Sequence, residues 1–331
     1  MEIALCHPAR EAFSYAPLLG CRLGYLDLSW ALIQPEPEVF DFSYYDPIVQ
    51  QAAASGLKLT GAVYSQRGGR YFPDDHWIWR EHRGMMPDPA AWSRFLATVV
   101  DRYQSVIRFW EVWSEPNCID CNPMSYYDPA LYRDEVLPLA SRTIRGVDPS
   151  AKIVLGGIWL NHLLQQYVEQ LFAGGKAAEY FDIFSWHFFL MVNDRRHLPL
   201  AVWKEPLCRL MEFFRRLLPG GCPIWITEFG LPTTAERGKT LRSSTRGEIL
   251  SLSEEEQVDW FSQFAELAET DWNIELLVWL MLADRQTSTD PNHFTHYLGL
   301  LRADGTEKPV ARHIAQLQAT QLSGGDPGPA K

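Results

Sequence analysis

Two glutamates in the sequence each follow an apolar, strand-like run and could together perform acid–base and nucleophilic chemistry. Glu115 follows residues 109–114, and Glu228 follows residues 224–227. If both runs are strands of one barrel, their ends meet at the same mouth. Paired carboxylates at such a mouth suit cleavage of a glycosidic bond, one as acid and base and the other as nucleophile. A single glutamate at a strand end would more often cap a loop or pair with an arginine, so the interpretation depends on the pair.

The segments that must position these glutamates alternate between strand-like and helix-like patterns. Residues 88–103 place apolar side chains at helical spacing, with Pro89 in the first turn. Ser253 and Glu256 have the spacing of a capping box and predict the start of another helix. Short apolar, β-branched or aromatic runs predict strands at residues 1–6, 24–30, 57–64, 107–113, 152–156, 181–187, 223–228 and 274–280.

Strand followed by helix, repeated about eight times, predicts an α/β fold with parallel strands and right-handed crossovers. We expect a single-domain (β/α)8 TIM barrel over residues 1–320 and a disordered tail, rich in glycine and proline, over residues 321–331. A doubly wound open sheet is the alternative, disfavoured because no Gly-x-Gly-x-x-Gly turn follows an early strand. The long loops at residues 65–87 and 285–298 would follow strands and lie at the mouth.

Composition narrows the classes of function. The chain has 331 residues and a formal net charge of −11, which disfavours a dedicated nucleic-acid-binding protein. No apolar run reaches the roughly 18 residues of a membrane span. The N-terminus has neither the basic nor the apolar segment of a signal peptide, so we expect a cytoplasmic protein.

The cysteines and histidines give weak indications of metal or redox chemistry. Six cysteines are scattered apart from Cys118 and Cys121, and one such pair alone favours reduced thiols over zinc or a disulfide. Residues 74–76 and 293–296 hold acidic and histidine side chains without a third partner at a recognised spacing. We therefore expect no metal and no cofactor.

The motifs around the two glutamates resemble those of clan A glycoside hydrolases, retaining (β/α)8 barrels that include families 5 and 39. Residues 113–117 read Trp-Ser-Glu-Pro-Asn, similar to the clan's Trp-Asn-Glu-Pro-Asn signature at the end of strand four. Residues 227–230 resemble the nucleophile segment of strand seven. Further similar segments surround Trp30, Trp186, Trp279 and residues 298–309 in the expected order, so the resemblance covers nearly the whole chain.

The resemblance implies a retaining enzyme that hydrolyses a β-linked glycoside or oligosaccharide without a cofactor. Glu115 would be the general acid and base, and Glu228 the nucleophile. The residues expected to contact substrate are Ser114, His187, Trp279, Trp30, Tyr25, Asn117 and Phe189. Trp77 and Trp79 could stack on sugar faces or merely pack within their loop.

Three positions depart from the clan's pattern and leave the activity open. Ser114 replaces an asparagine, Tyr25 replaces an arginine that supports the nucleophile, and Phe189 replaces a tyrosine whose hydroxyl contacts it. Losing a cation and a hydroxyl should raise the pKa of Glu228 and weaken it as a nucleophile. Arg22 lies three residues before Tyr25, and an odd spacing on a regular strand places the two side chains on opposite faces. Arg22 could therefore replace the missing arginine only if its strand is irregular.

These departures motivate two alternatives on the same barrel. One is a non-hydrolytic carbohydrate-binding or regulatory protein, and the other is a transglycosylase that uses the same two carboxylates. A further carboxylate, Glu111, lies four residues before Glu115 and should point into the barrel. We expect it to be a buried structural group with a polar partner.

Overall fold

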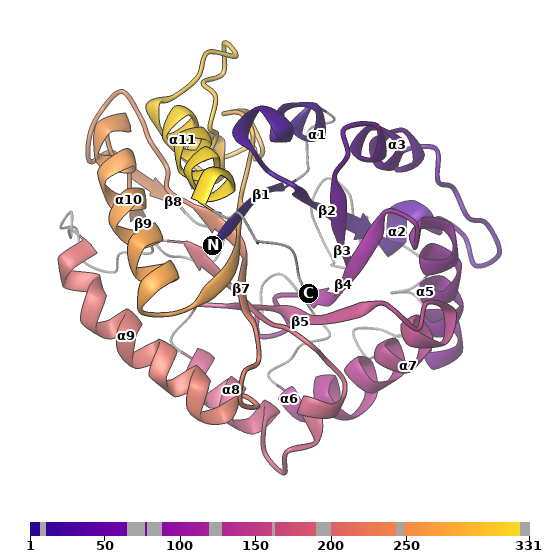
Figure 1. Cartoon of the computed structure of the whole chain (residues 1–331). Helices are drawn as coiled ribbons and strands as arrows, with labels where there is room; N and C mark the ends of the chain where they lie inside the picture. Colours follow the sequence, from indigo (N-terminus) through magenta and orange to yellow (C-terminus); the bar gives the residue numbers. More distant parts are fainter. Residues whose placement is uncertain are drawn as a thin grey trace, which may run out of the picture.

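The computed structural model describes residues 1–6, 11–64, 77, 88–118, 128–160, 163–189, 200–242 and 248–324. Eight parallel strands form a closed barrel (Figure 1). In chain order they are β1 (Glu2–Cys6), β2 (Leu23–Ser29), β3 (Lys58–Tyr64), β4 (Ile107–Ser114), β5 (Lys152–Trp159), β6 (Phe184–Phe189), β7 (Ile224–Gly230) and β10 (Ile274–Trp279). The predicted (β/α)8 barrel is therefore confirmed.

The barrel closes because its first and last strands pair. Glu2 of β1 is in register with Leu276 of β10, and Leu5 is in register with Trp279. Every other neighbour in the ring is also its neighbour in the chain, apart from the inserted hairpin described below. Such strands are buried on both faces, and this explains their nearly continuous apolar sequences.

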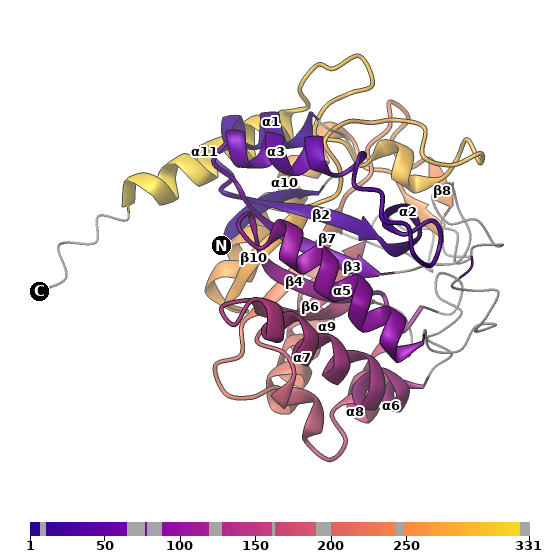
Figure 2. The same cartoon turned by 90° about the vertical axis from the view of Figure 1, so that its right-hand side faces the viewer.

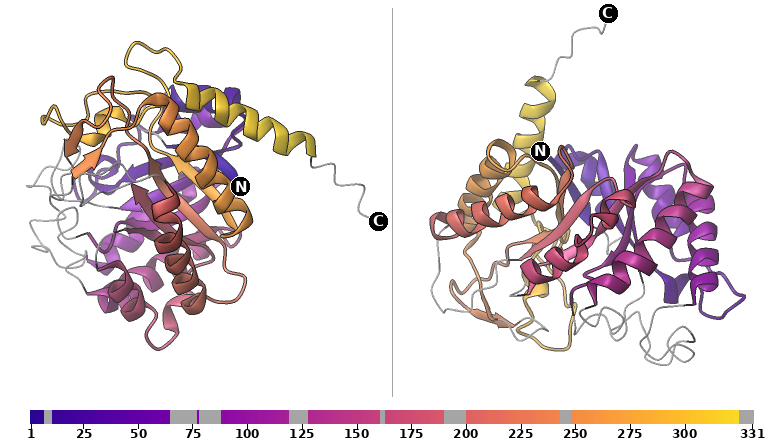
Figure 3. Two further views of the ribbon diagram at one scale, coloured as in Figure 1. Left: turned by 90° about the vertical axis from the view of Figure 1, so that its left-hand side faces the viewer. Right: turned by 90° about the horizontal axis from the view of Figure 1, so that it is seen from below.

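Helices cover the outside of the barrel, as two further views show (Figure 3). The longer helices are α3 (Asp46–Ala54), α5 (Pro89–Tyr103), α7 (Leu137–Val147), α8 (Leu164–Leu171), α9 (Leu200–Leu217), α10 (Glu254–Thr270) and α11 (Pro309–Gly324). The short elements are α1 (Ala12–Tyr15), η1 (Ala16–Leu19), α2 (Trp30–Ile33), α6 (Pro129–Leu131), η2 (Tyr132–Val136), η3 (Lys176–Glu179) and η4 (Phe294–Tyr297).

Local sequence explains where α5 and α10 begin. The Asp88 side chain accepts a hydrogen bond from the Ala91 backbone N–H at 2.8 Å, directly before the apolar stripe of α5. At α10, the Ser253 hydroxyl caps the Glu256 N–H, and the Glu256 carboxylate accepts from the Ser253 N–H. The predicted capping box is therefore confirmed.

A small antiparallel hairpin follows β7 and was not predicted. Its strands are β8 (Thr240–Arg242) and β9 (Glu248–Leu250). It contributes to a second apolar cluster beside the main core, which contains Phe189, Leu241, Ile249, Met281, Phe294 and Leu298.

The two ends of the barrel differ. Figure 2 shows the start of β1 and the free end of α11 on one side, with α2 and β8 on the other. Helix α11 continues to Gly324, four residues into the expected tail, and residues 325–331 lie outside the described part. Among the described residues, no helix is long and apolar enough to cross a membrane.

Candidate active site

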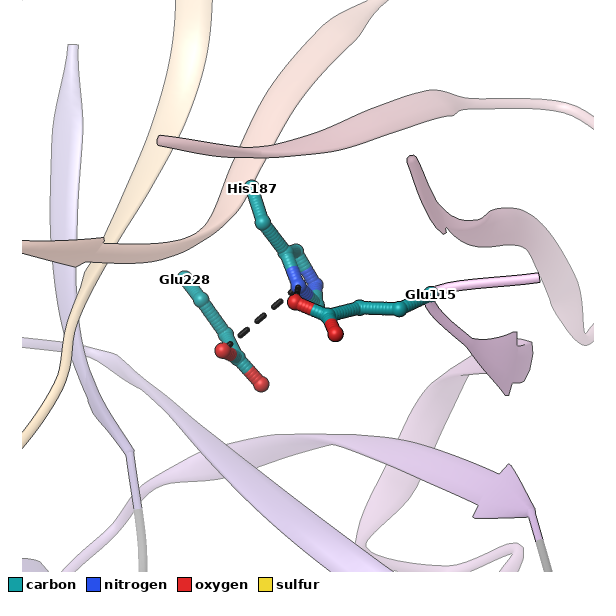
Figure 4. Close-up of side chains that lie close together, drawn as sticks. All are labelled: Glu115, His187 and Glu228. Carbon is teal, nitrogen blue, oxygen red and sulfur yellow. Dashed lines mark hydrogen bonds and ion pairs between the residues drawn. The ribbon is translucent and has the colours of Figure 1, made fainter. Parts of the chain in front are cut away.

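Glu115 and Glu228 converge at the carboxyl ends of their strands (Figure 4). Glu115 directly follows β4, and Glu228 lies within β7. One carboxylate oxygen of each lies within 4.8 Å of the other and of a His187 ring nitrogen. The side chains are 15% and 18% exposed, so solvent reaches both groups. The sequence prediction that these two residues meet is consistent with this geometry.

An unusual backbone conformation turns Glu115 out of the sheet. Its φ is 47°, and that of Trp113 is 73°, in the left-handed region that side chains other than glycine rarely adopt. The Glu115 N–H donates to the Gly157 carbonyl at 3.0 Å, and the Glu115 carbonyl accepts from the Cys118 N–H at 2.9 Å. Backbone strain of this kind is common at functional sites, where the surrounding structure holds it in place.

His187 of β6 connects the two glutamates. Its Nδ1 lies 3.0 Å from a Glu115 oxygen and 3.5 Å from a Glu228 oxygen, and the side chain is fully buried. Burial lowers the pKa of His187, but the carboxylates of Glu228, Glu115 and Glu111 outweigh it and raise the pKa to about 9. The imidazole is therefore held as a cation between two carboxyl groups.

A buried polar layer lies below these three residues. The Glu111 carboxylate accepts hydrogen bonds from the Tyr25 hydroxyl at 2.8 Å, the Ser185 hydroxyl at 3.1 Å and the Gly157 N–H at 3.2 Å. The expectation that Glu111 is a buried carboxylate with a polar partner is thus confirmed. Tyr25 supports Glu111 rather than Glu228.

The surroundings of Glu228 disfavour its charged form. Burial raises its pKa most, the charge of His187 lowers it, and Glu115, Asp27 and Glu111 raise it, which together bring the pKa to about 8. Burial likewise raises the pKa of Asp27, on β2, to about 7. Sequence reasoning missed Asp27, although its two-residue spacing from Tyr25 on a strand would have placed both on one face. The direction matches the expected rise in the pKa of Glu228, but burial is its largest cause rather than the loss of a cation and a hydroxyl.

Arg22 does not replace the missing arginine. It precedes β2, is 70% exposed and lies 3.6 Å from Glu2. Glu2 begins β1, at the opposite end of the barrel from Glu115 and Glu228. In the described part of the chain, the cationic group that pairs with Glu228 is His187.

Two predicted substrate contacts are aromatic rings inside the protein. Trp30 is buried against Trp92 and Phe95, and its indole N–H donates to Gln34 at 2.7 Å. Trp279 is fully buried, and its N–H donates to the Leu298 carbonyl at 2.9 Å. Neither ring has an exposed face on which a sugar could stack, so the structure corrects both predictions.

Two further predicted contacts also have structural partners. The Asn117 amide donates to the Trp159 carbonyl and accepts from its N–H, both at 2.8 Å, which ties the end of β4 to β5. Phe189 is buried and packs edge-to-face on Phe294 in the second apolar cluster. These contacts favour positioning roles over direct substrate contact. Ser114 is also buried, beside Glu115 at the end of β4.

Several other predictions fall in loops. The Trp77 ring packs edge-to-face on Trp30, and its N–H donates to the Gln34 carbonyl at 2.9 Å, so it packs against α2 and the residue that follows it. Trp79 and residues 74–76 lie outside the described residues. His293 lies 2.6 Å from the Thr295 hydroxyl. The donor atoms of Glu115, His187 and Glu228 are close enough to admit a metal ion, but hydrogen bonding explains their convergence, and we assign no metal ligand.

The cysteine prediction was wrong at one position. Cys118 is disulfide-bonded and buried three residues after Glu115, whereas Cys6, Cys21, Cys208 and Cys222 are free. Cys121 lies outside the described residues. The prediction of reduced thiols rested on an expected reducing compartment.

The architecture is similar to that of solved glycoside hydrolases of families 39, 5 and 10, all of clan A. A family 39 glycoside hydrolase from Bacteroides cellulosilyticus WH2 is 18% identical, with a TM-score of 0.66 over 97% of this chain and 64% of that chain. An exo-β-1,4-mannosidase from Opitutaceae bacterium strain TAV5 is 15% identical, with a TM-score of 0.69 over 98% and 60%. Xylanase 10B from Thermotoga maritima is 16% identical, with a TM-score of 0.63 over 98% and 96%.

These similarities establish a shared fold. The chain spans less than two thirds of the length of the first two of these proteins. No family model matches the sequence.

Proposed function

We propose that the chain is a retaining glycoside hydrolase that cleaves a β-linked glycoside, with Glu115 as general acid and base and Glu228 as nucleophile. The observation that supports this proposal is the convergence of the two carboxyl groups, with oxygens within 4.8 Å of one another. Carboxyl groups about 5–5.5 Å apart are typical of retaining enzymes, whereas inverting enzymes need about 6.5–9.5 Å to admit a water.

The reaction would proceed in two displacements. Glu228 attacks the anomeric carbon, while Glu115 donates a proton to the glycosidic oxygen and the aglycone leaves. Glu115 then takes a proton from a water molecule, whose oxygen attacks the anomeric carbon and releases Glu228. His187, 3.0 Å from Glu115 and 3.5 Å from Glu228, would stabilise the carboxylate that bears the charge at each stage.

The structural neighbours guide the choice of substrates. They include a β-1,4-mannosidase, a xylanase and a β-xylosidase from Caulobacter crescentus, each with the barrel fold described above. A panel of nitrophenyl β-glycosides of xylose, mannose, glucose and galactose, together with xylo- and manno-oligosaccharides, therefore includes the sugars named for these neighbours and two further common ones.

The proposal is tested by comparing the wild-type protein with Glu228→Gln and Glu115→Gln. We expect Glu228→Gln to lower kcat by at least about a thousandfold on every substrate that the wild type cleaves. Glu115→Gln should slow substrates with poor leaving groups far more than activated aryl glycosides, because good leaving groups need little protonation. The exposed Glu179 lies outside the site, and Glu179→Gln is the matched control.

The stereochemistry provides a separate measurement. Proton NMR of the first product should show the β-anomer before mutarotation. An α-anomer would exclude the double displacement, and undiminished turnover by Glu228→Gln would exclude this residue as nucleophile.

The raised pKa of Glu228 favours one second candidate, a carbohydrate-binding protein without turnover. A nucleophile with a pKa of about 8 is largely protonated at neutral pH. In that case the wild type would cleave none of the panel at any pH between about 6 and 9, while calorimetry would still detect oligosaccharide binding. Cleavage that increases with pH would favour the enzyme.

A further inference from the structure

Glu111 is a buried charge to which the proposed reaction gives no role. It lies on β4, four residues before Glu115, and its side chain is fully buried. Donors from three strands meet its two oxygens: Tyr25 of β2, Gly157 of β5 and Ser185 of β6. A buried carboxylate costs folding free energy unless it is paired and hydrogen-bonded. The hydrogen-bond donors and the charge of His187 favour the charged form of Glu111, while burial is the larger effect and raises the pKa of Glu111 above its usual value.

His187 lies between Glu111 and the two glutamates at the mouth. Its Nε2 is 3.9 Å from a Glu111 oxygen, while its Nδ1 faces Glu115 at 3.0 Å and Glu228 at 3.5 Å. A neutral imidazole carries a proton on one nitrogen only. The doubly protonated ring carries an N–H on the side of Glu111 and another on the side of Glu115 and Glu228. The Nε2 makes no hydrogen bond among the described residues, so its interaction with Glu111 is electrostatic.

The backbone of β5 fixes this ring. A Cβ atom at Gly157 would lie 1.9 Å from the His187 Nε2, so no side chain fits there. Gly157 also donates its N–H to Glu111, and its carbonyl accepts the Glu115 N–H. One residue thus sets the positions of the buried carboxylate, the imidazole and the outer glutamate together.

We infer that Glu111 is a positioning residue: it is the counter-ion that holds His187 as an imidazolium, whose Nδ1–H then serves Glu115 and Glu228. The inference rests on the proposed function. By keeping His187 charged, Glu111 would provide Glu115 and Glu228 with a cation, which replaces the arginine expected at the position of Tyr25. The charged groups that face His187 are Asp27 from β2, Glu111 from β4, Glu115 directly after β4, and Glu228 from β7. Glu228 and Glu115 contribute most to the rise in the pKa of His187 to about 9, and Glu111 adds to it.

The test follows the protonation of His187 directly, without substrate. The chain has nine histidines, so 15N-histidine NMR spectra are assigned by comparison with a His187→Asn variant. In the wild type we expect both His187 nitrogens to be protonated at pH 7. In Glu111→Gln, which keeps the shape and removes the charge, we expect the proton affinity of His187 to fall at least tenfold, a shift of one pH unit or more.

Glu179→Gln is the control. It removes an exposed carboxylate outside the site, so the His187 titration midpoint should stay where the wild type has it. Where substrate is cleaved, the alkaline limb of kcat/KM should move to lower pH in Glu111→Gln by the same amount as the NMR midpoint. The alkaline limb of Glu179→Gln should not move.

The outcomes separate this inference from the proposed function. A neutral His187 in the wild type at pH 7 overturns the inference. This NMR measurement needs no variant of Glu111, so it tests the inference even if Glu111→Gln fails to fold. An unchanged midpoint in folded Glu111→Gln also overturns it. A chain that cleaves no glycoside, but whose His187 midpoint falls in Glu111→Gln, refutes the proposed function and upholds the pairing of Glu111 with His187.

Discussion

In the proposed reaction Glu228 must be ionised to attack, and its surroundings hold its pKa at about 8. Of the charges responsible, Asp27 is the simplest to remove. In the described part of the chain its side chain makes no hydrogen bond or ion pair, and its effect on Glu228 is electrostatic. Asp27 is thus a charge that tunes the proposed nucleophile without contacting it.

Asp27→Asn should therefore shift the pH dependence of turnover. Removing this negative charge lowers the pKa of Glu228, so the acid limb of kcat/KM, expected near pH 8, should move to lower pH, with increased activity at neutral pH. The measurement is a pH–rate profile beside Asp101→Asn, an exposed control on α5. An acid limb that stays in place or moves to higher pH would contradict this account.

At the residue scale, the sequence predicted that Glu115 and Glu228, the proposed catalytic pair, lie at strand ends on the same mouth of the barrel, but it misjudged several of the residues around them. Glu115 and Glu228 could be recognised because a carboxylate at a strand end is a local pattern. Trp279 was expected to face a sugar, but it packs on Phe229 and Phe261, and only the three-dimensional packing shows this. The role of Glu111 depends in the same way on contacts between separate strands.

At the scale of elements, strands were predicted well because a buried parallel strand has its own apolar signal. All eight barrel strands overlap their predicted ranges. Strands β8 and β9 were missed because each has three residues, too few for a periodic pattern, and their pairing is decided by packing against Phe294 and Leu298. Helix α11 extends beyond residue 320, where the tail was predicted to begin. Residues 321–323 contain no proline or glycine that would end the helix before Gly324.

Strand β5 provides a prediction at this scale. In Gly157→Ala the new methyl group must displace the His187 ring, because the two would otherwise be 1.9 Å apart. Misplacing a catalytic group by about 1 Å can cost a hundredfold in rate, and we expect at least that loss in kcat with the circular dichroism spectrum retained.

The control for this prediction is Gly146→Ala. Gly146 lies in α7, and a Cβ there meets nothing within 4 Å. The Gly146→Ala substitution should leave activity unchanged and stabilise the protein by about 0.5–1 kcal/mol, because alanine favours a helix more than glycine does. Normal turnover in Gly157→Ala would show that the site tolerates movement of His187.

For the whole molecule, the buried cluster makes stability depend on pH. The usual pKa values of Asp27, Glu228 and His187 are 3.8, 4.5 and 6.5, and folding raises them to about 7, 8 and 9. All three groups bind protons more tightly in the folded state. Their stabilising contribution is complete below the unfolded pKa values and is lost as pH rises through the folded ones.

The melting temperature should therefore fall as pH increases from about 5 to about 9. Differential scanning calorimetry at constant ionic strength measures this, and an Asp27→Asn, Glu228→Gln double variant should show a flatter dependence. A melting temperature that is constant or rises over this interval would show that other groups dominate the proton balance of unfolding.

The pairing of β1 with β10 has a consequence for how the chain acquires its structure. Glu2 meets Leu276 in the ring, so the ring is completed only after nearly the whole chain has been synthesised. Until then β1 and β7 each present an unpaired edge, which can pair with another chain. Contacts so distant in sequence make folding slow and the nascent chain prone to aggregation. The pairing of β10 with both β1 and β7 removes the two edges together.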